Sequence, residues 1–318
     1  MTRSEFHTPL QRCSANCTIL PSLHGNVAIL MHCADIIHIF AAKYYIMQDR
    51  VTLPQWLENL IFDQLGAKYC RSNADMTVIE WDKNNVLNYL GTYFPRSYAE
   101  SYCIFSEFFT KWPYRFVDKT ELSVFDFGCG TGGEIIGLLD AMRNIQNIQK
   151  VKIYGLDGNY HALRLLERIV NECSNKYTFK IKLNVIPITI EDFYDLDVLS
   201  SVHAEKYDIF LSFKAICEFV SKERFEHQNA YTHIARTYLS RLNDDGIMIL
   251  ADVTSYNNVS QEWLPRMMDL GLAQADCRII LKNDGYNQTF VVHHKKKRKD
   301  ISKIAWRIVS PSNRCCNV

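Results

Sequence analysis

The 318-residue sequence lacks the features that mark several large classes of protein. Its 36 basic and 35 acidic residues leave a net charge of +1, so composition alone favours neither nucleic acid nor an acidic partner. The longest apolar stretch, residues 26–42, is short and contains His32, Asp35 and His38, which argues against a membrane span. No repeat, low-complexity tract or secretory signal is recognisable. We therefore expect a cytoplasmic protein with a substantial core and no membrane partner.

The eleven cysteines lack the spacing of a structural metal site. No paired C-x-x-C arrangement occurs, so the sequence predicts no metal centre, and we expect most thiols to be reduced and buried. One alternative stays open, because a group of cysteines and histidines near the N-terminus is close enough in sequence to gather a metal ion. This group consists of Cys13, Cys17, His24, His32 and Cys33.

Glycine is scarce, with 13 residues in all, but four of the glycines lie within residues 128–133. The segment 124–134 has the pattern of an apolar strand, a glycine-rich turn and the start of a helix, with Asp126 just before the turn. Glycine lets the backbone turn sharply and approach a ligand without a Cβ atom, and free N–H groups at a helix start suit a polar ligand. This segment therefore predicts a cofactor pocket.

Two classes of cofactor compete for the pocket, because the glycines also satisfy the G-x-G-x-x-G spacing of dinucleotide-binding folds. Asp126 argues against a dinucleotide, since its carboxylate would repel a pyrophosphate but suits the ammonium group of an amino acid. The motif also begins only at residue 124, whereas a dehydrogenase usually starts with it. Both observations favour a cofactor with an amino-acid portion.

Residues 124–134 resemble the E/D-x-G-x-G-x-G motif of class I S-adenosylmethionine (SAM) methyltransferases, and further segments resemble this family in the same order. These are residues 153–157 for the second strand, 185–193 for the third strand and its following turn, 207–214 for the fourth strand, and 242–252 for a turn and the fifth strand. The resemblance covers roughly residues 120–310. It implies an α/β fold with a Rossmann-like, seven-stranded, mostly parallel sheet and antiparallel C-terminal strands.

The resemblance also implies SAM as the cofactor and a role for each matching residue. Asp126 is expected near the ammonium group, and the two oxygens of Asp157 suit the two ribose hydroxyl groups. Thr189 and Ile190 are expected to hold the adenine, with Asp192 as an alternative to them. The expected cofactor-binding residues are Asp126, Phe127, Gly128, Cys129, Gly130, Gly132, Asp157, Gly158, Thr189, Ile190, Glu191, Ser212 and Phe213.

We expect two domains, a helical N-terminal cap over residues 1–112 and a SAM-binding domain over residues 113–318. From residue 121 onward strand and helix patterns alternate, which predicts a largely parallel sheet with helices on both faces. Within the cap, apolar spacing predicts helices over 26–37, 56–65, 82–94 and 98–109, the last two separated by Pro95. The last strands are expected over 277–281, 289–293 and 303–309.

A second, shorter resemblance covers residues 85–108. They are similar to the helices that precede the SAM domain in the methyltransferase-like family of mitochondrial small-ribosomal-subunit assembly and in its bacterial relatives. The shared pattern is an aromatic residue or arginine, a proline and then a Tyr-Ala helix. The chain lacks the clustered cysteines of the metal-binding members of that family.

The expected activity is transfer of the sulfonium methyl group to an acceptor. Lys214 and Glu218 are the candidate catalytic residues, since they can orient an acceptor or remove its proton, although a surface ion pair fits the same spacing. We expect the methyl acceptor to be RNA, for example ribosomal RNA. Residues 293–299 form the only strongly basic run of the sequence and could bind a phosphate backbone. A solvated loop between two strands explains this run equally well. The open alternatives are a small-molecule or protein acceptor and a SAM-binding assembly or regulatory factor without activity.

Overall fold

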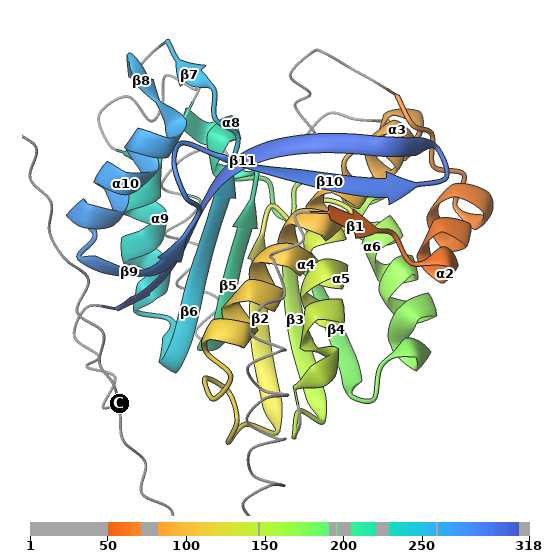
Figure 1. Ribbon diagram of the computed structural model, residues 1–318, viewed down its shortest axis with the longest axis horizontal. Coiled ribbons are helices and arrows are strands. Elements are labelled where there is room, and N and C mark those ends of the chain that lie inside the picture. The colour runs from red at the N-terminus through yellow and green to blue at the C-terminus, as the bar shows by residue number, and fades with distance from the viewer. Residues whose placement is uncertain are drawn as a thin grey trace, which may run out of the picture. The chain divides into compact units, whose positions relative to one another are not determined.

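The structure is a computed structural model that describes residues 50–70, 82–145, 147–190, 195, 205–220, 229–258 and 260–311. All of these residues belong to one compact unit, residues 47–318. Its helices, in chain order, are α2 (Gln55–Glu58), η1 (Asn59–Gln64), α3 (Lys83–Thr92), α4 (Phe94–Lys111), α5 (Gly133–Ala141), η2 (Met142–Asn144), α6 (Tyr160–Cys173), η3 (Ser174–Lys176), α8 (Ile216–Val220), α9 (Ala230–Leu239) and α10 (Leu264–Gln274). Its strands are β1 (Arg50–Thr52), β2 (Glu121–Phe127), β3 (Lys150–Leu156), β4 (Lys180–Ile186), β5 (Tyr207–Phe213), β6 (Leu242–Asp252), β7 (Tyr256–Asn257), β8 (Glu262–Trp263), β9 (Cys277–Lys282), β10 (Gln288–His294) and β11 (Lys297–Pro311) (Figure 1).

Among the described residues the main sheet has nine strands, not the expected seven, in the order β1-β10-β11-β6-β5-β2-β3-β4, with β9 also paired to β11. The strands from β2 to β6 run parallel to one another, and β11 is antiparallel to β6. β9 and β10 pair with successive halves of the 15-residue β11, so together they fill a single strand position. The predicted α/β fold, a mostly parallel sheet with antiparallel C-terminal strands, is confirmed, and β1 is an additional edge strand.

Side chains of β2 alternate between two hydrophobic cores. Val124 belongs to the core shared with α4, α5 and α6, whereas Phe125 and Phe127 belong to the core shared with α9 and α10. Successive side chains of a strand point to opposite faces, so a nearly continuous apolar run requires helices on both faces of the sheet. Figure 1 shows α4 and α5 crossing one face of β2 and β3.

The helices before β2 differ in detail from the expected ones. The segment expected to be one helix over 56–65 is the short α2 followed by a turn of π-helix, η1. α4 begins at Phe94, so Pro95 starts this helix instead of separating two helices, because a proline in the first turn has no N–H group that needs a partner. The predicted helix over 26–37 lies outside the described residues.

α4 and α5 pack unusually closely through two glycines of α5. A Cβ atom on Gly133 would lie 2.5 Å from the carbonyl oxygen of Phe94, and one on Gly137 would lie 2.4 Å from that of Tyr98. The glycine-rich segment thus serves helix packing as well as the turn. This packing holds α4 beside the start of α5, next to the turn after β2.

The described residues before residue 112, 50–70 and 82–111, are part of the same compact unit as the sheet. β1 pairs with β10, and α4 packs against β10 as well as α5. The division into a cap and a SAM-binding domain at residue 112 stays a prediction. None of the helices among the described residues combines the length and the apolar character that a membrane crossing requires.

Candidate cofactor site

The turn between β2 and α5 uses left-handed backbone three times. The φ angles of Gly128, Gly130 and Gly132 are 74°, 47° and 80°, values that residues with a Cβ atom rarely adopt. The backbone N–H groups of Gly128 and Cys129 both donate to the carbonyl oxygen of Leu156, at 2.9 Å. These bonds fix the turn against the carboxyl end of β3.

Asp157 follows β3 and connects the turn to the next helix. Its Oδ2 accepts a hydrogen bond from the N–H group of Gly130 at 2.8 Å, and its Oδ1 accepts one from that of Asn159 at 2.7 Å. Burial raises the pKa of Asp157, and these two N–H groups oppose the rise. Each carboxylate oxygen has two lone pairs, so both oxygens keep the capacity to accept a further hydrogen bond.

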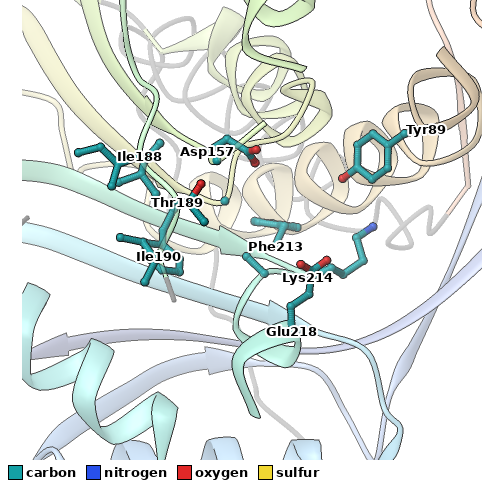
Figure 2. A pocket seen from close by; sticks show the side chains of 13 residues that line it. Tyr89, Asp157, Ile188, Thr189, Ile190, Phe213, Lys214 and Glu218 are labelled. Atoms are coloured by element: carbon teal, nitrogen blue, oxygen red, sulfur yellow. The ribbon is translucent and has the colours of Figure 1, made fainter. Parts of the chain in front are cut away.

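A cavity of about 60 Å³ lies at the carboxyl ends of β2, β3 and β5 (Figure 2). Figure 2 shows Ile188, Thr189 and Ile190 on one side of the cavity and Tyr89 on the opposite side. The thirteen lining residues are Tyr89, Phe127, Gly128, Leu156, Asp157, Gly158, Ile188, Thr189, Ile190, Phe213, Lys214, Ala215 and Glu218. The cavity therefore lies where the turn, the end of β3 and the tip of β5 meet.

Seven of the expected cofactor-binding residues line this cavity: Phe127, Gly128, Asp157, Gly158, Thr189, Ile190 and Phe213. Five others, Asp126, Cys129, Gly130, Gly132 and Ser212, are not among its lining residues. Glu191 lies outside the described residues, as does the alternative Asp192. The structure brings together residues from four separate segments, but their binding roles stay predictions.

Tyr89 is a lining residue that no sequence motif marks. It comes from α3, and a Cβ atom on Gly130 would lie 3.1 Å from its hydroxyl oxygen, so the ring covers the turn. Burial raises the pKa of the Tyr89 phenol, and the carboxyl groups of Glu134, Asp157 and Glu218 raise it further. The hydroxyl group therefore stays protonated at neutral pH and remains a hydrogen-bond donor.

Asp126 lies fully buried beside the turn. Among the described residues its two oxygens have no donor other than the adjacent carboxyl group of Glu134. Burial raises the pKa of Asp126 well above its ordinary value, and Glu134 raises it further. Burial also raises the pKa of Glu134 to about 7, although the ammonium group of Lys214 acts in the opposite direction. Two adjacent buried carboxyl groups resist double ionisation, and a cation beside them would favour it.

Lys214 occupies the tip of β5 with a φ angle of 57°. A left-handed conformation costs a residue other than glycine about 1–3 kcal/mol and is concentrated at functional sites. The Lys214 N–H group donates to the carbonyl oxygen of Ala251 at 2.7 Å, and Nζ lies 2.6 Å from Oε2 of the fully buried Glu100. Lys214 precedes α8, so it does not share a helical turn with Glu218, although both residues line the cavity.

The basic run forms the turn between β10 and β11 and the first residues of β11. Residues 295–299 are all exposed, although the Lys295 side chain itself is only 27% exposed. Lys295 is held in place, because its ammonium group pairs with Asp63 and its N–H group donates to Oε1 of Glu58 at 2.9 Å. The run is thus the end of a paired hairpin rather than an irregular loop.

Across the described ranges, no three or more His, Cys, Asp or Glu side chains gather closely enough to hold a metal ion. The N-terminal group of Cys13, Cys17, His24, His32 and Cys33 lies outside these ranges. Cys129, inside the glycine turn, is buried, and burial raises the pKa of its thiol well above the ordinary value. A cysteine of this kind is a packing residue rather than a nucleophile.

Comparison with known proteins finds no matching family model and no matching curated protein. Solved structures do match. A DszA carbon methyltransferase is 12% identical, with a TM-score of 0.47, over 73% of this chain and 61% of that one. A SAM-dependent methyltransferase from Aquifex aeolicus is 12% identical, with a TM-score of 0.41, over 72% of this chain and 100% of that one. Fibrillarin from Aeropyrum pernix, solved with bound SAM, is 16% identical, with a TM-score of 0.33, over 59% of this chain and 66% of that one. At TM-scores below 0.5 these matches carry no argument about function, which depends on the site itself.

Proposed function

We propose that this chain is a SAM-dependent methyltransferase whose cofactor binds along the carboxyl ends of β2, β3 and β5. The observation that carries the proposal is the contact between a left-handed glycine turn and an acidic residue at the end of the adjacent strand. It is the 2.8 Å hydrogen bond from Gly130 to Asp157. In open α/β sheets, ligands bind at the carboxyl ends of the strands, where this contact lies.

The residues around the turn fit the parts of SAM. The Asp157 carboxylate suits a ribose diol, and the side chains of Ile188 and Ile190 offer an apolar surface to an adenine ring. The buried carboxyl groups of Asp126 and Glu134 favour a cationic amino-acid portion beside the turn. When bound, SAM supplies a methyl group that its sulfonium charge has already activated.

Binding requires the cavity to widen. Its volume of about 60 Å³ is well below the roughly 300–1,000 Å³ of typical small-molecule sites. Tyr89 lies over Gly130, so displacement of α3 would uncover the turn. We propose that α3 is a lid, which opens to admit the cofactor and then returns Tyr89 to exclude water.

Lys214 and Glu218 are the residues that we propose to act on the acceptor. Both line the cavity at the tip of β5, and Figure 2 shows their side chains close to each other beside Phe213. Glu100 positions the Lys214 ammonium group through the 2.6 Å ion pair. The Glu218 carboxylate can then accept a proton from the acceptor atom, while Lys214 orients it.

For the acceptor we propose RNA, because the exposed basic run at the β10–β11 turn suits a phosphate backbone. Replacing Lys296 and Lys297 with glutamine should weaken RNA binding and flatten its dependence on salt concentration. The matched control is a pair of lysines away from this turn, Lys180 and Lys182 of β4, whose replacement should change neither quantity. Unchanged RNA binding in the first variant would favour the small-molecule or protein alternatives.

The test of the cofactor is isothermal titration calorimetry with SAM and with its demethylated product. Asp157→Ala should weaken binding by about 3 kcal/mol or more, since two charge-assisted hydrogen bonds contribute roughly 1.5–3 kcal/mol each. Asp157→Asn keeps one acceptor oxygen, so its affinity for SAM should lie between those of the wild type and Asp157→Ala. Asp284→Asn, at an exposed loop position, is the matched control and should bind normally. A folded, cofactor-free sample that gives no heat with either compound would contradict the proposal. If SAM binds but no acceptor is methylated, the chain is instead a binding factor without activity.

A further inference from the structure

Three exposed aromatic side chains cluster beyond the carboxyl end of β6. Tyr256 and Trp263 pair across the β7–β8 hairpin with ring centroids 5.2 Å apart, and Tyr286 meets Trp263 at 5.8 Å. The exposed fractions of these residues are 44%, 47% and 47%. We call the three residues the aromatic platform. Contiguous exposed apolar surface is uncommon on soluble proteins and marks interaction sites.

Hydrogen bonds hold the platform in a fixed shape. The Tyr286 hydroxyl group donates to the carbonyl oxygen of Thr254 at 3.0 Å. Oδ1 of Asn257 accepts a hydrogen bond from the N–H group of Ser260 at 3.1 Å, which supports the turn of the β7–β8 hairpin. Rings that are already ordered lose little entropy when a partner binds.

The platform lies close to the candidate cofactor site. Thr254, which anchors Tyr286, follows Ala251 by three residues, and Ala251 accepts the hydrogen bond from the cavity-lining residue Lys214. Three residues of extended chain span at most about 11 Å. Along the top of Figure 1, β7 and β8 lie at the left and the β10–β11 turn lies at the right. α8 and α3 lie between them.

We propose that the aromatic platform stacks unpaired bases of a single-stranded nucleic acid, whose phosphate backbone continues toward the basic β10–β11 turn. The proposal rests on the proposed function, because it identifies how the acceptor is held. Aromatic side chains stack on any nucleobase, since every base has a π face. The charged neighbours Glu262 and Arg266 pair with each other at 3.0 Å, so the platform adds little net charge to repel phosphates.

The five exposed basic residues at 295–299 favour nucleic acid over a protein partner. A run of like charges complements a polyphosphate, and aromatic residues supply the base contacts that phosphate binding alone does not provide. A protein partner would need an acidic surface opposite the basic run and an apolar surface opposite the platform, at the same separation. A single-stranded nucleic acid carries phosphates and bases along its whole length, so it can contact both surfaces without such a match.

The test measures fluorescence anisotropy with two labelled probes of equal length, oligouridine and an abasic oligomer that has the same backbone without bases. Trp263→Ala should weaken oligouridine binding roughly 5- to 150-fold, the range for loss of one stacked base, and should leave abasic binding unchanged. The basic-turn variant Lys296→Gln/Lys297→Gln should weaken binding of both probes. Tyr114→Ala is the matched control, because Tyr114 is 80% exposed and precedes β2, at the opposite end of that strand from the cavity.

Two further variants keep the proposal falsifiable if Trp263→Ala fails to fold. Trp263→Phe preserves a stacking ring and should retain most of the oligouridine affinity. Tyr256→Ala removes a ring at the rim and should weaken oligouridine binding alone. Equal oligouridine affinity in the wild type and the folded platform variants would overturn the proposal, as would a platform-dependent protein complex in a chain that does not bind oligouridine.

Calorimetry with SAM on the same samples separates the two proposals. A platform variant that binds SAM normally but has lost oligouridine affinity supports the platform. A wild-type chain that stacks oligouridine through Trp263 but gives no heat with SAM refutes the proposed cofactor and leaves the platform intact.

Discussion

The ion pair between Lys214 and Glu100 joins α4 to the tip of β5, and its removal has a predictable cost. Nζ lies 2.6 Å from Oε2, and the two side chains are only 15% and 0% exposed. Removing one member of a buried pair leaves an uncompensated charge, which costs about 3–5 kcal/mol. We therefore expect Lys214→Met to lower the free energy of unfolding by about this amount.

The two positions should be strongly coupled. Oε1 of Glu100 already lacks a hydrogen-bond partner among the described residues, so the carboxylate depends on Lys214. Adding Glu100→Gln to Lys214→Met removes the stranded charge and should restore much of the lost stability. The interaction energy of this double-mutant cycle should approach the upper end of the ~0.5–3 kcal/mol range for residues in contact.

The measurement is urea denaturation of the wild type, both single variants and the double variant at neutral pH. Arg266 and Glu262 supply the reference cycle, because they form a pair four residues apart whose side chains are 71% and 25% exposed. That pair should contribute only about 0.2–1 kcal/mol. If Lys214→Met lowers the free energy of unfolding by no more than loss of the reference pair does, the ion pair does not stabilise the contact between α4 and the tip of β5.

Three further predictions follow from other parts of the structure. Gly137→Ala should lower the free energy of unfolding by at least about 1–3 kcal/mol in calorimetry, because its Cβ atom would lie 2.4 Å from the Tyr98 carbonyl oxygen. Burial raises the pKa of Asp252 to about 7, so the folded state binds this proton more tightly than the unfolded chain. Stability should therefore fall as the pH rises from about 4 to 7, and Asp252→Asn should reduce that fall in urea titrations. Tyr89→Ala should accelerate SAM association in stopped-flow measurements, because the ring no longer covers Gly130.

The sequence predicts the interior strands well because their signal is local. The segment expected to hold a turn and the fifth strand, residues 242–252, is strand throughout as β6, and β2 leads directly into the glycine turn. The predicted start of the third parallel strand is wrong. The sequence pattern predicts that this strand begins at residue 185, whereas β4 covers Lys180–Ile186. β4 lies at the edge of the sheet and alternates polar and apolar residues. An edge strand of this kind has a weaker signal than the apolar run that follows it.

The parts of the site that the sequence did not reveal depend on contacts between distant segments. Tyr89 reaches the turn from α3, and Glu100 reaches Lys214 across 114 positions of sequence. Sequence spacing suggested Glu218 as the neighbour of Lys214 on one helical turn. The left-handed backbone of Lys214 breaks that helix register, and no local pattern predicts a left-handed lysine.

The buried carboxyl groups beside the glycine turn determine which class of cofactor the site favours. Burial raises the pKa of both Asp126 and Glu134, and the neighbouring Glu134 raises that of Asp126 further, so an added positive charge would stabilise the ionised form of both. At an effective dielectric constant of 20, a unit charge 4 Å away contributes about 4 kcal/mol, favourable for a cation and unfavourable for an anion. A pyrophosphate would meet this repulsion at the glycine turn, whereas an ammonium or sulfonium group would relieve it. The G-x-G-x-x-G spacing leaves the choice of cofactor open, and these two carboxyl groups favour the cationic cofactor that we propose.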